Sequence, residues 1–411
     1  MRTAIIGIVY GLLWITTGGF AQDAPGGSGS GTAKKTETID GKTLAEWREI
    51  LKTGDASRRT AAIVAICQFG EEASKAVNDL IAVMDKDPDV SPRVKAVHAM
   101  RMIEIEGKDV DRVVRALARR LSRAEGGESQ VVVRHEALLA LLRFAPDASP
   151  AVPALKRAAF DPGSWELRQK AVSCLWRTAI ENKGKTEGPD GEIVLTLLDV
   201  VIAKNSTYEV KMEALMGLTY MGKPADATIQ TRLINELTIY AKGPTVGRES
   251  NASRTMQIWA LAALANLGEN PGLIKTPQAR LSSFLKDKNL DIRRQAAAAL
   301  GGLGKTASSQ LPSLLAMLDD EEPSAVAAAC QAILLIGDTS EVVVDKLVGM
   351  LEAKNPSTVA TALNALLALK KNTKKVMDAI QKQLDRKDVD KALQAYMDAV
   401  KKELEKPTRK P

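Results

Sequence analysis

Residues 290–304 read Leu-Asp-Ile-Arg-Arg-Gln-Ala-Ala-Ala-Ala-Leu-Gly-Gly-Leu-Gly, and this stretch decides the fold. When Ile292 is counted as position 0, eight other segments of the chain align with it without gaps. Their starts are 33 to 46 residues apart. Position +4 is alanine in every segment, at Ala62, Ala96, Ala137, Ala171, Ala214, Ala260, Ala296, Ala329 and Ala362. A pattern that recurs at this spacing indicates an array of repeated structural units.

The repeated segment has the pattern of a helix that packs closely against its neighbours. Position +7 is always small and position +8 is always large and apolar, as in Ala299 and Leu300. Positions 0, 4, 7 and 8 fall on one face of a helix of 3.6 residues per turn. Another amphipathic stretch precedes each segment, for example residues 110–121 and 342–351. A two-helix unit cannot bury its apolar face alone, so we expect stacked helix pairs that share one core.

The motif resembles the HEAT-like repeat family, in the short form found in phycobilin lyases. The residues that carry the resemblance are Val133-Arg134, Ala137 and Ala140-Leu141 in one segment, and their counterparts in residues 292–304. The resemblance covers about residues 41–385. It implies an all-α fold: a right-handed α-solenoid of the armadillo and HEAT type, with second helices along the concave side. We expect about nine helix pairs, followed by a capping helix over residues 389–403.

In this family the residue at position +1 is commonly an arginine that joins a ladder between repeats. Here that position holds Arg59, Arg93, Arg134, Arg168 and Arg293 in five repeats. Val326 and Val359 replace it in the last repeats, which depart from the family pattern.

The N-terminus has the pattern of a secretory leader. Arg2 is followed by an uncharged apolar stretch over residues 4–15, which is short for a membrane span. Small residues precede Gln22, so we expect cleavage after Ala21. The predicted organisation is a signal peptide over 1–21, a Gly/Ser linker over 22–40, the solenoid over 41–385, and a capping helix with a basic tail over 386–411. The expected location is the periplasm or the exterior, and an uncleaved N-terminal anchor is the alternative.

The positive net charge of +7 is concentrated at the C-terminus. Residues 370–411 hold 13 Lys/Arg and 7 Asp/Glu, whereas residues 22–369 hold 43 of each. A neutral body argues against general capture of DNA or RNA, so we expect no nucleic-acid partner.

The composition offers few residues for catalysis. There are three cysteines and two histidines in 411 residues, and we expect Cys67, Cys174 and Cys330 to be separate buried thiols. The related deoxyhypusine hydroxylase binds two irons through several His-Glu pairs, whereas this chain has only His135-Glu136. One pair cannot supply a di-iron site. We therefore expect no enzymatic activity, no bound metal and no cofactor.

The face of the second helices opposite the core carries positions +2, +6 and +10. In the middle repeats it combines methionine, tyrosine and arginine, which are enriched at protein interfaces. The candidate contact residues are His98, Met102, His135, Leu139, Arg143, Gln169, Arg177, Met212, Met216, Tyr220, Ile258 and Asn266.

A second candidate surface is an arginine stripe on one expected first helix. It consists of Arg112, Arg115, Arg119 and Arg123, which the helical period places on one face. The stripe is a candidate anion-binding site, and a solvated face balanced by Asp109 and Asp111 is the alternative.

The sequence thus predicts an exported, non-enzymatic scaffold that binds a protein or peptide on its concave face. One alternative is an enzyme or accessory subunit of the lyase or hydroxylase type, which bound iron would favour. The other is a polyanion-binding module, which steep salt dependence of binding would favour.

Overall fold

The computed structural model describes residues 38–123, 127–181, 190–243, 250–268, 271–386 and 389–406. The predicted leader (1–21) and nearly all of the predicted linker (22–40) lie outside these residues. The chain divides into two compact units, an N-terminal unit up to Glu236 and a C-terminal unit from Leu237.

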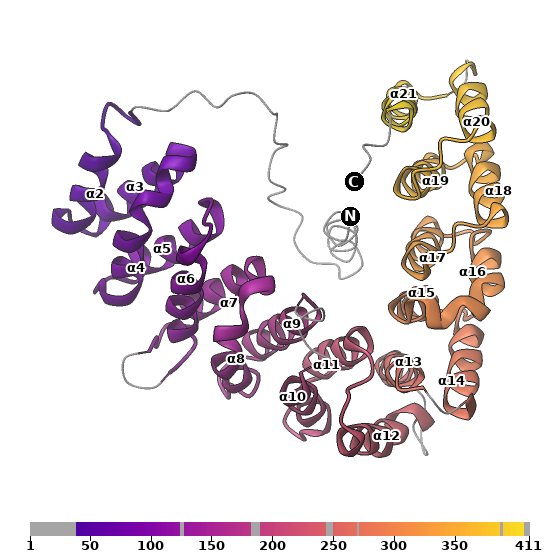
Figure 1. Ribbon diagram of the computed structural model, residues 1–411, viewed down its shortest axis with the longest axis horizontal. Helices are drawn as coiled ribbons and strands as arrows, with labels where there is room; N and C mark the ends of the chain where they lie inside the picture. The colour runs from indigo at the N-terminus through magenta and orange to yellow at the C-terminus, as the bar shows by residue number, and fades with distance from the viewer. Residues whose placement is uncertain are drawn as a thin grey trace. The chain divides into compact units, whose positions relative to one another are not determined.

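The N-terminal unit is built of helix pairs. Its helices are α2 (Leu44–Thr53), α3 (Ala56–Ile66), α4 (Val77–Lys86), α5 (Val90–Met102), α6 (Lys108–Arg120), α7 (Val131–Arg143), α8 (Val152–Ala158), α9 (Trp165–Glu181), α10 (Gly191–Ile202) and α11 (Tyr208–Met221). Three 3-10 turns accompany them: η1 (Cys67–Ala76), η2 (Ala145–Asp147) and η3 (Ser149–Ala151). The second helices α3, α5, α7, α9 and α11 pack in one row and the first helices in another (Figure 1).

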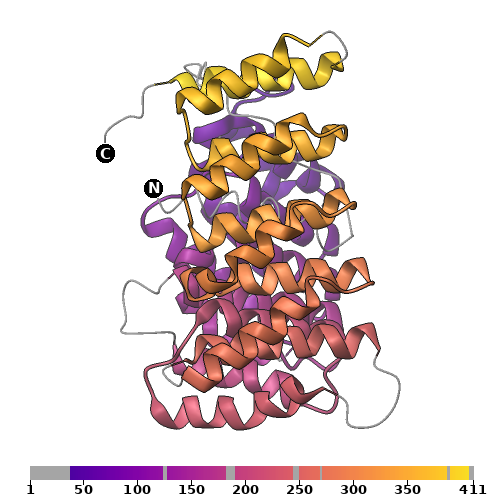
Figure 2. The same ribbon diagram turned by 90° about the vertical axis from the view of Figure 1, so that its right-hand side faces the viewer.

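The C-terminal unit continues the pattern. After α12 (Ala227–Lys242), which crosses from one unit into the other, come α13 (Asn251–Asn266), α14 (Pro271–Phe284), α15 (Leu290–Gly302), η4 (Gly304–Gln310), α16 (Leu311–Met317), α17 (Pro323–Ile336), α18 (Glu341–Gly349), η5 (Met350–Glu352), α19 (Pro356–Ala368), α20 (Lys374–Leu384) and α21 (Lys391–Glu405). Figure 2 shows the orange and yellow helices of this unit stacked one on the next.

The alanine column found in the sequence forms the centre of the core. The side chains at position +4, from Ala62 to Ala362, are all 0% exposed. The large residues at position +8 are at most 4% exposed. Small residues let adjacent helices approach, and the large residue beside them fills the remaining volume. The structure therefore confirms the predicted α-solenoid.

The arginines at position +1 form the expected ladder. Arg59 donates to Asp87 at 2.6 and 2.8 Å, and Arg93 donates to Glu128 at 2.8 and 3.1 Å. Arg134 pairs with Asp161 and is only 1% exposed. Further along the chain Arg168 donates to the Asn205 carbonyl, and Arg293 donates to Asp320.

Each ladder carboxylate also helps to start the next second helix. Asp87 Oδ1 accepts the backbone N–H of Asp89, and Glu128 Oε1 accepts that of Gln130. A side-chain oxygen at this point satisfies a donor that the helix itself leaves free. One carboxylate thus joins two repeats and fixes the entry of the second of them.

The last helix has a partner that the sequence analysis did not assign. A single capping helix is the expectation from sequence, but α21 packs against α20 as well as α19. Among the described residues α20 and α21 thus form a tenth helix pair. The buried residues of α21 are Met397, Val400 and Leu404, and its remaining faces are largely polar, as the end of a stack requires.

Candidate functional site

The most exposed large apolar side chain on the second-helix face of the N-terminal unit lies on α5. Met102 is 60% exposed, and the side chain of His98, one turn before it, is 45% exposed. Leu139 on α7 and Met216 on α11 are half-buried at the same position +6 as His98. Gln169, Arg177 and His135 are also half-buried. The face therefore offers several partly accessible side chains on four adjacent helices.

Charges on this face are arranged around Glu136. Its Oε2 lies 3.4 Å from Arg101 Nη1 and 3.8 Å from His98 Nδ1. The neighbouring His135 is half-buried, and burial lowers its pKa, an effect that Glu136 partly opposes. Neutral imidazole is thus favoured at position 135.

Arg143 is exposed, and its guanidinium also binds the C-terminal end of α5. Its Nη1 donates to the carbonyls of Met100 at 3.1 Å and Ile103 at 2.9 Å, and also to that of Arg101. These carbonyls lie at the C-terminal end of α5, where a helix leaves acceptors without partners. Arg143 therefore fixes the end of the helix that carries Met102.

An aromatic cluster joins α9 and α11. The rings of Trp176 and Tyr220 stack at a centroid distance of 5.5 Å and an interplanar angle of 18°. Trp176 Nε1 donates to Glu213 Oε1 at 2.8 Å, and the Arg177 guanidinium lies 4.9 Å from the Trp176 ring centroid. Burial and the nearby Glu213 raise the pKa of Tyr220. The cluster rigidifies this part of the face and leaves Tyr220 half-buried.

Two predicted contact residues are buried, and the prediction was wrong for them. Ile258 is 0% exposed and Met212 is 8% exposed. Ile258 belongs to the stretch 257–265 of α13, which is apolar or small on nearly all sides and buried throughout. Met212 lies on α11, which approaches α9 so closely that a Cβ at Gly217 would lie 2.8 Å from Trp176. Asn266, on α13, is half-buried.

Arg112, Arg115 and Arg119 of the predicted arginine stripe lie on α6, whereas Arg123 lies after the end of that helix, so the prediction of one helical stripe was wrong for Arg123. Each of the four has an acidic neighbour. Arg112 lies 3.3 Å from Asp109, and Arg115 lies 2.9 Å from Asp111. Arg119 lies 2.7 Å from Asp85 on α4, and Arg123 lies 3.8 Å from Asp161. Asp85 and Asp161 are each shared with a second arginine, Arg120 and Arg134, so the acidic neighbours offset the charge of the stripe in part.

Sequence reasoning missed Trp176 and Glu213 because it read only positions +2, +6 and +10. A recurring offset could have found them. Arg101 at +9 pairs with Glu136 at +3 of the next repeat, and Trp176 at +9 pairs with Glu213 at +3 of its next repeat. Polar residues at these two positions therefore signal contacts between adjacent second helices.

All three cysteines are free, and Cys174 and Cys330 are buried as predicted, whereas Cys67 is only half-buried. Burial raises the pKa of Cys67 to about 11 and that of Cys174 to about 12. Within the described ranges no group of three or more His, Cys, Asp or Glu residues is placed to hold a metal ion. Within the same ranges no helix is long and apolar enough to cross a membrane.

Comparison with known proteins agrees with this geometry. Residues 248–334 match the family model described as HEAT repeats. Residues 248–334 are therefore HEAT repeats. The matched residues run from just before α13 to α17, and the same alanine column extends through the other HEAT repeats of the chain. A search of curated protein sequences found no match.

Several solved structures share the HEAT-repeat fold. Importin-β in a polyethylene glycol condition is 15% identical and superimposes with a TM-score of 0.53, covering 88% of this chain and 52% of that one. Yeast importin-β (Kap95p) is 13% identical and superimposes with a TM-score of 0.53, covering 88% of this chain and 52% of that one. The structure of Kap95p with RanGDP is 12% identical and has a TM-score of 0.50, covering 88% of this chain and 51% of that one. The chain thus spans about half the length of importin-β, and these likenesses establish the fold alone.

Proposed function

We propose that this HEAT-repeat protein is a non-enzymatic scaffold that binds a protein or peptide on the second-helix face of its N-terminal unit. The observation that carries the proposal is Met102, which is 60% exposed on the face that also carries the half-buried Leu139 of α7 and Met216 of α11. A methionine thioether adapts to irregular apolar surfaces. A side chain of this kind, held on a fixed helix, suits an apolar side chain of a partner.

The surroundings of Met102 support the proposal because they fix the surface before any partner arrives. Arg143 holds the end of α5, and the arginine ladder fixes the spacing of α5 and α7. A rigid surface loses little side-chain freedom on binding, which favours affinity. The expected partner segment presents an apolar residue to Met102, and a polar residue to Glu136 and Arg101. Kap95p, which shares this fold, binds RanGDP.

Site-specific photo-crosslinking tests this proposal. A photoreactive amino acid replaces Met102 in the full chain, expressed in its own cells, and a matched variant carries it at Val342 on α18. Val342 is similarly exposed, at 64%, but lies on a first helix of the C-terminal unit. We expect one crosslinked protein at position 102 that is absent at position 342 and lost when Leu139→Glu is added. Equal crosslinking at both positions contradicts the proposal.

We propose further that the protein is exported and that its mature form begins at Gln22. The pattern of residues 1–21 supports this, and those residues lie outside the described ranges. Mass spectrometry of the intact protein from the exported fraction tests it, with a mature N-terminus at Gln22 as the expected result. A retained Met1 in a membrane fraction would instead support the N-terminal anchor.

The two alternative functions have separate readouts. Metal analysis of the purified protein tests the lyase or hydroxylase alternative, since bound iron would support it. Retention on heparin across a salt series tests the polyanion alternative. The acidic partners of Arg112, Arg115, Arg119 and Arg123 weigh against the stripe as a general polyanion site.

A further inference from the structure

One first helix of the N-terminal unit is much shorter than its neighbours. Helix α8 has 7 residues, whereas α6 has 13 and α10 has 12. The segment that leads into α8 carries Pro146 and Pro150, and proline breaks a helix interior because it lacks an N–H and clashes with the preceding turn. The chain forms the 3-10 turns η2 and η3 there instead. A helix of this length leaves the surface open on both of its sides.

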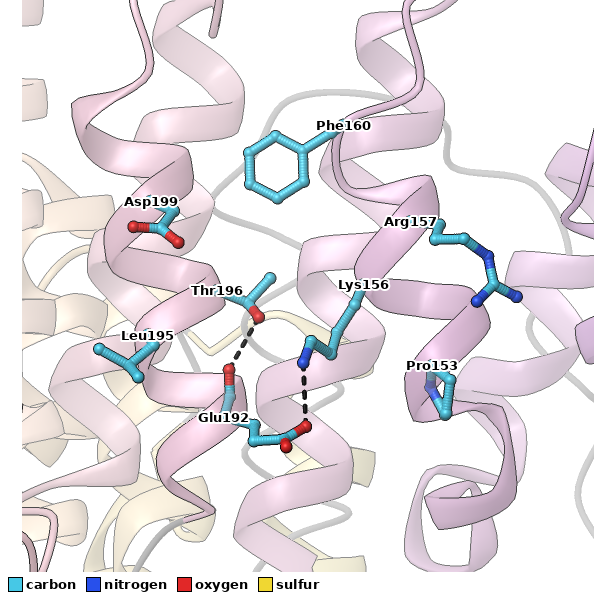
Figure 3. Close-up of a pocket in the computed structure, with 8 residues that line it drawn as sticks. All are labelled: Pro153, Lys156, Arg157, Phe160, Glu192, Leu195, Thr196 and Asp199. Atoms are coloured by element: carbon cyan, nitrogen blue, oxygen red, sulfur yellow. Dashed lines mark hydrogen bonds and ion pairs between the residues drawn. The ribbon is translucent and has the colours of Figure 1, made fainter.

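Two adjoining hollows flank α8 on the first-helix side. The hollow between α8 and α10 has a volume of about 770 Å³ and includes Phe160 and Leu195 (Figure 3). The hollow between α6 and α8 has a volume of about 430 Å³ and includes Arg115 and Arg119. Arg157 and Pro153 line both hollows, so the two form one groove across α6, α8 and α10.

The apolar part of the groove lies toward α10. Figure 3 shows Phe160 projecting from the end of α8 toward α10, and its exposed fraction is 42%. The polar groups around it are already occupied. Lys156 Nζ lies 2.9 Å from Glu192 Oε2, and Asp199 Oδ1 lies 2.6 Å from Arg232 Nη2. The exposed ring of Phe160 is therefore free for an apolar side chain.

The free charge of the groove lies on its other side. Arg115 and Arg119 are each paired with an aspartate. Arg157 is exposed and forms no ion pair with any described residue. Among the described residues the groove therefore has one uncompensated positive charge, with two further guanidinium groups beside it. The paired carboxylates Asp85, Asp111, Glu192 and Asp199 would repel a long polyanion, but they leave room for one or two localised negative charges.

We propose that this groove, here called the α8 groove, binds a partner-protein segment with an acidic pair followed within a few residues by a bulky apolar side chain. The acidic side chains meet Arg157 in the hollow that Arg115 and Arg119 also line, and the apolar side chain covers Phe160. The α8 groove lies on the first helices and is independent of the second-helix face. Either surface functions without the other.

Fluorescence anisotropy with a defined probe tests the α8 groove. The probe is a labelled peptide of sequence Gly-Glu-Glu-Gly-Leu-Phe-Gly, titrated with the full chain, beside a control peptide in which lysine replaces both glutamates. A contact of this size is weak, so we expect a Kd on the order of 100 µM for the acidic peptide. The lysine peptide should bind about tenfold more weakly or worse.

Three variants define the site. Arg157→Glu should weaken binding of the acidic peptide about tenfold, and Phe160→Ala should also weaken it. Lys305→Glu, an equal change of charge on the exposed turn η4, should leave it unchanged. The proposal is overturned if the acidic peptide does not bind, or if Arg157→Glu and Lys305→Glu bind it equally. It is also overturned if heparin displaces the peptide and Phe160→Ala has no effect, since that describes a simple cationic patch.

Discussion

In the first three repeats of the N-terminal unit, position +1 of the second helix carries an arginine that pairs with a carboxylate of the next repeat. In the last repeats of the C-terminal unit the same position carries Val326 and Val359, which are 1% and 3% exposed. The partner position changes as well: after Asp320, which pairs with Arg293, the equivalent residue of the next repeat is Ala353. The two units thus stack the same helix pair with a buried ion pair in one place and apolar side chains in the other.

This difference indicates what the repeat requires. The space between consecutive repeats has to be filled, and every buried charge has to have a partner. An ion pair meets both conditions only when both members are present. An apolar pair meets them without any charge. The repeat therefore tolerates replacement of both members much better than loss of one.

Loss of one ladder member should have the largest effect on stability. In Asp161→Ala the guanidinium of Arg134, which is 1% exposed, loses its carboxylate. Breaking a buried pair in this way costs about 3 to 5 kcal/mol in unfolding free energy. Urea unfolding followed by circular dichroism measures it, and hydrogen exchange of α7 and α9 shows whether the loss is local.

The matched control removes both charges. Asn at position 161 can still accept from the backbone N–H of Gly163, as Asp161 does at 2.7 Å. The double variant Arg134→Leu/Asp161→Asn should therefore lie within about 1 kcal/mol of the natural protein. If it is as unstable as Asp161→Ala, the ladder has a role that apolar packing cannot replace.

The reverse experiment places a charge in an apolar repeat. Val326→Arg introduces a guanidinium at a position that is 1% exposed, and should cost about 3 kcal/mol. Adding Ala353→Asp supplies the carboxylate that the ladder has at this position in other repeats, and should restore at least half of the loss. The measurement is hydrogen exchange in α17 and α19. If the effects of the two substitutions on unfolding free energy simply add, the two positions do not face each other.

Glycines in the two units should respond in opposite directions. In Gly217→Ala the new Cβ would lie 2.8 Å from atoms of Trp176, so crowding should destabilise the N-terminal unit by about 1 to 3 kcal/mol. At Gly349, in α18 of the C-terminal unit, an added Cβ would have no atom within 4 Å, so Gly349→Ala should stabilise by about 0.5 to 1 kcal/mol. Thermal unfolding compares them. Equal shifts in melting temperature would show that the close approach of α9 and α11 relaxes easily.

Much of the fold followed from short-range pattern. Alanine at +4 has one physical consequence, close helix approach, and Ala62 to Ala362 are all fully buried. The ladder followed from the family resemblance, and Arg59 and Arg93 make the expected contacts. Both features depend only on residues that recur at fixed offsets within each repeat.

The candidate site was less predictable because exposure depends on local spacing between helices. Met212 and Met102 both belong to the predicted face, yet Met212 is buried and Met102 is open. Arg143 looked like a contact residue, and its position in the sequence did not reveal its bonds to the end of α5. The α8 groove arises from prolines that shorten one helix, which a search for regular repeats does not examine.

The smallest expected effect is a pH dependence confined to the N-terminal unit. His135 at position +2 of α7 is half-buried, and burial lowers its pKa from the usual 6.5. Glu136 and Glu166 oppose that change, and Lys170 and Arg101 add to it. In the last repeats position +2 is Ala327 and Ala360, which do not titrate.

The folded protein protonates His135 less readily than the unfolded chain does. The contribution of neutral His135 to stability is therefore fully present above pH 6.5. It should fall as the pH drops below 6.5 toward the lowered pKa of His135. In His135→Gln this part of the fall in melting temperature with decreasing pH should disappear. The control is His98→Gln, a change at a more exposed position. Melting temperatures between pH 8 and 5.5 measure it, with hydrogen exchange of α7 as the local readout. If the melting temperature of His135→Gln falls with pH as steeply as that of the natural protein, other groups titrate in this range. A charged imidazole at position +2 is then tolerated without an ion-pair partner, unlike the arginine at position +1.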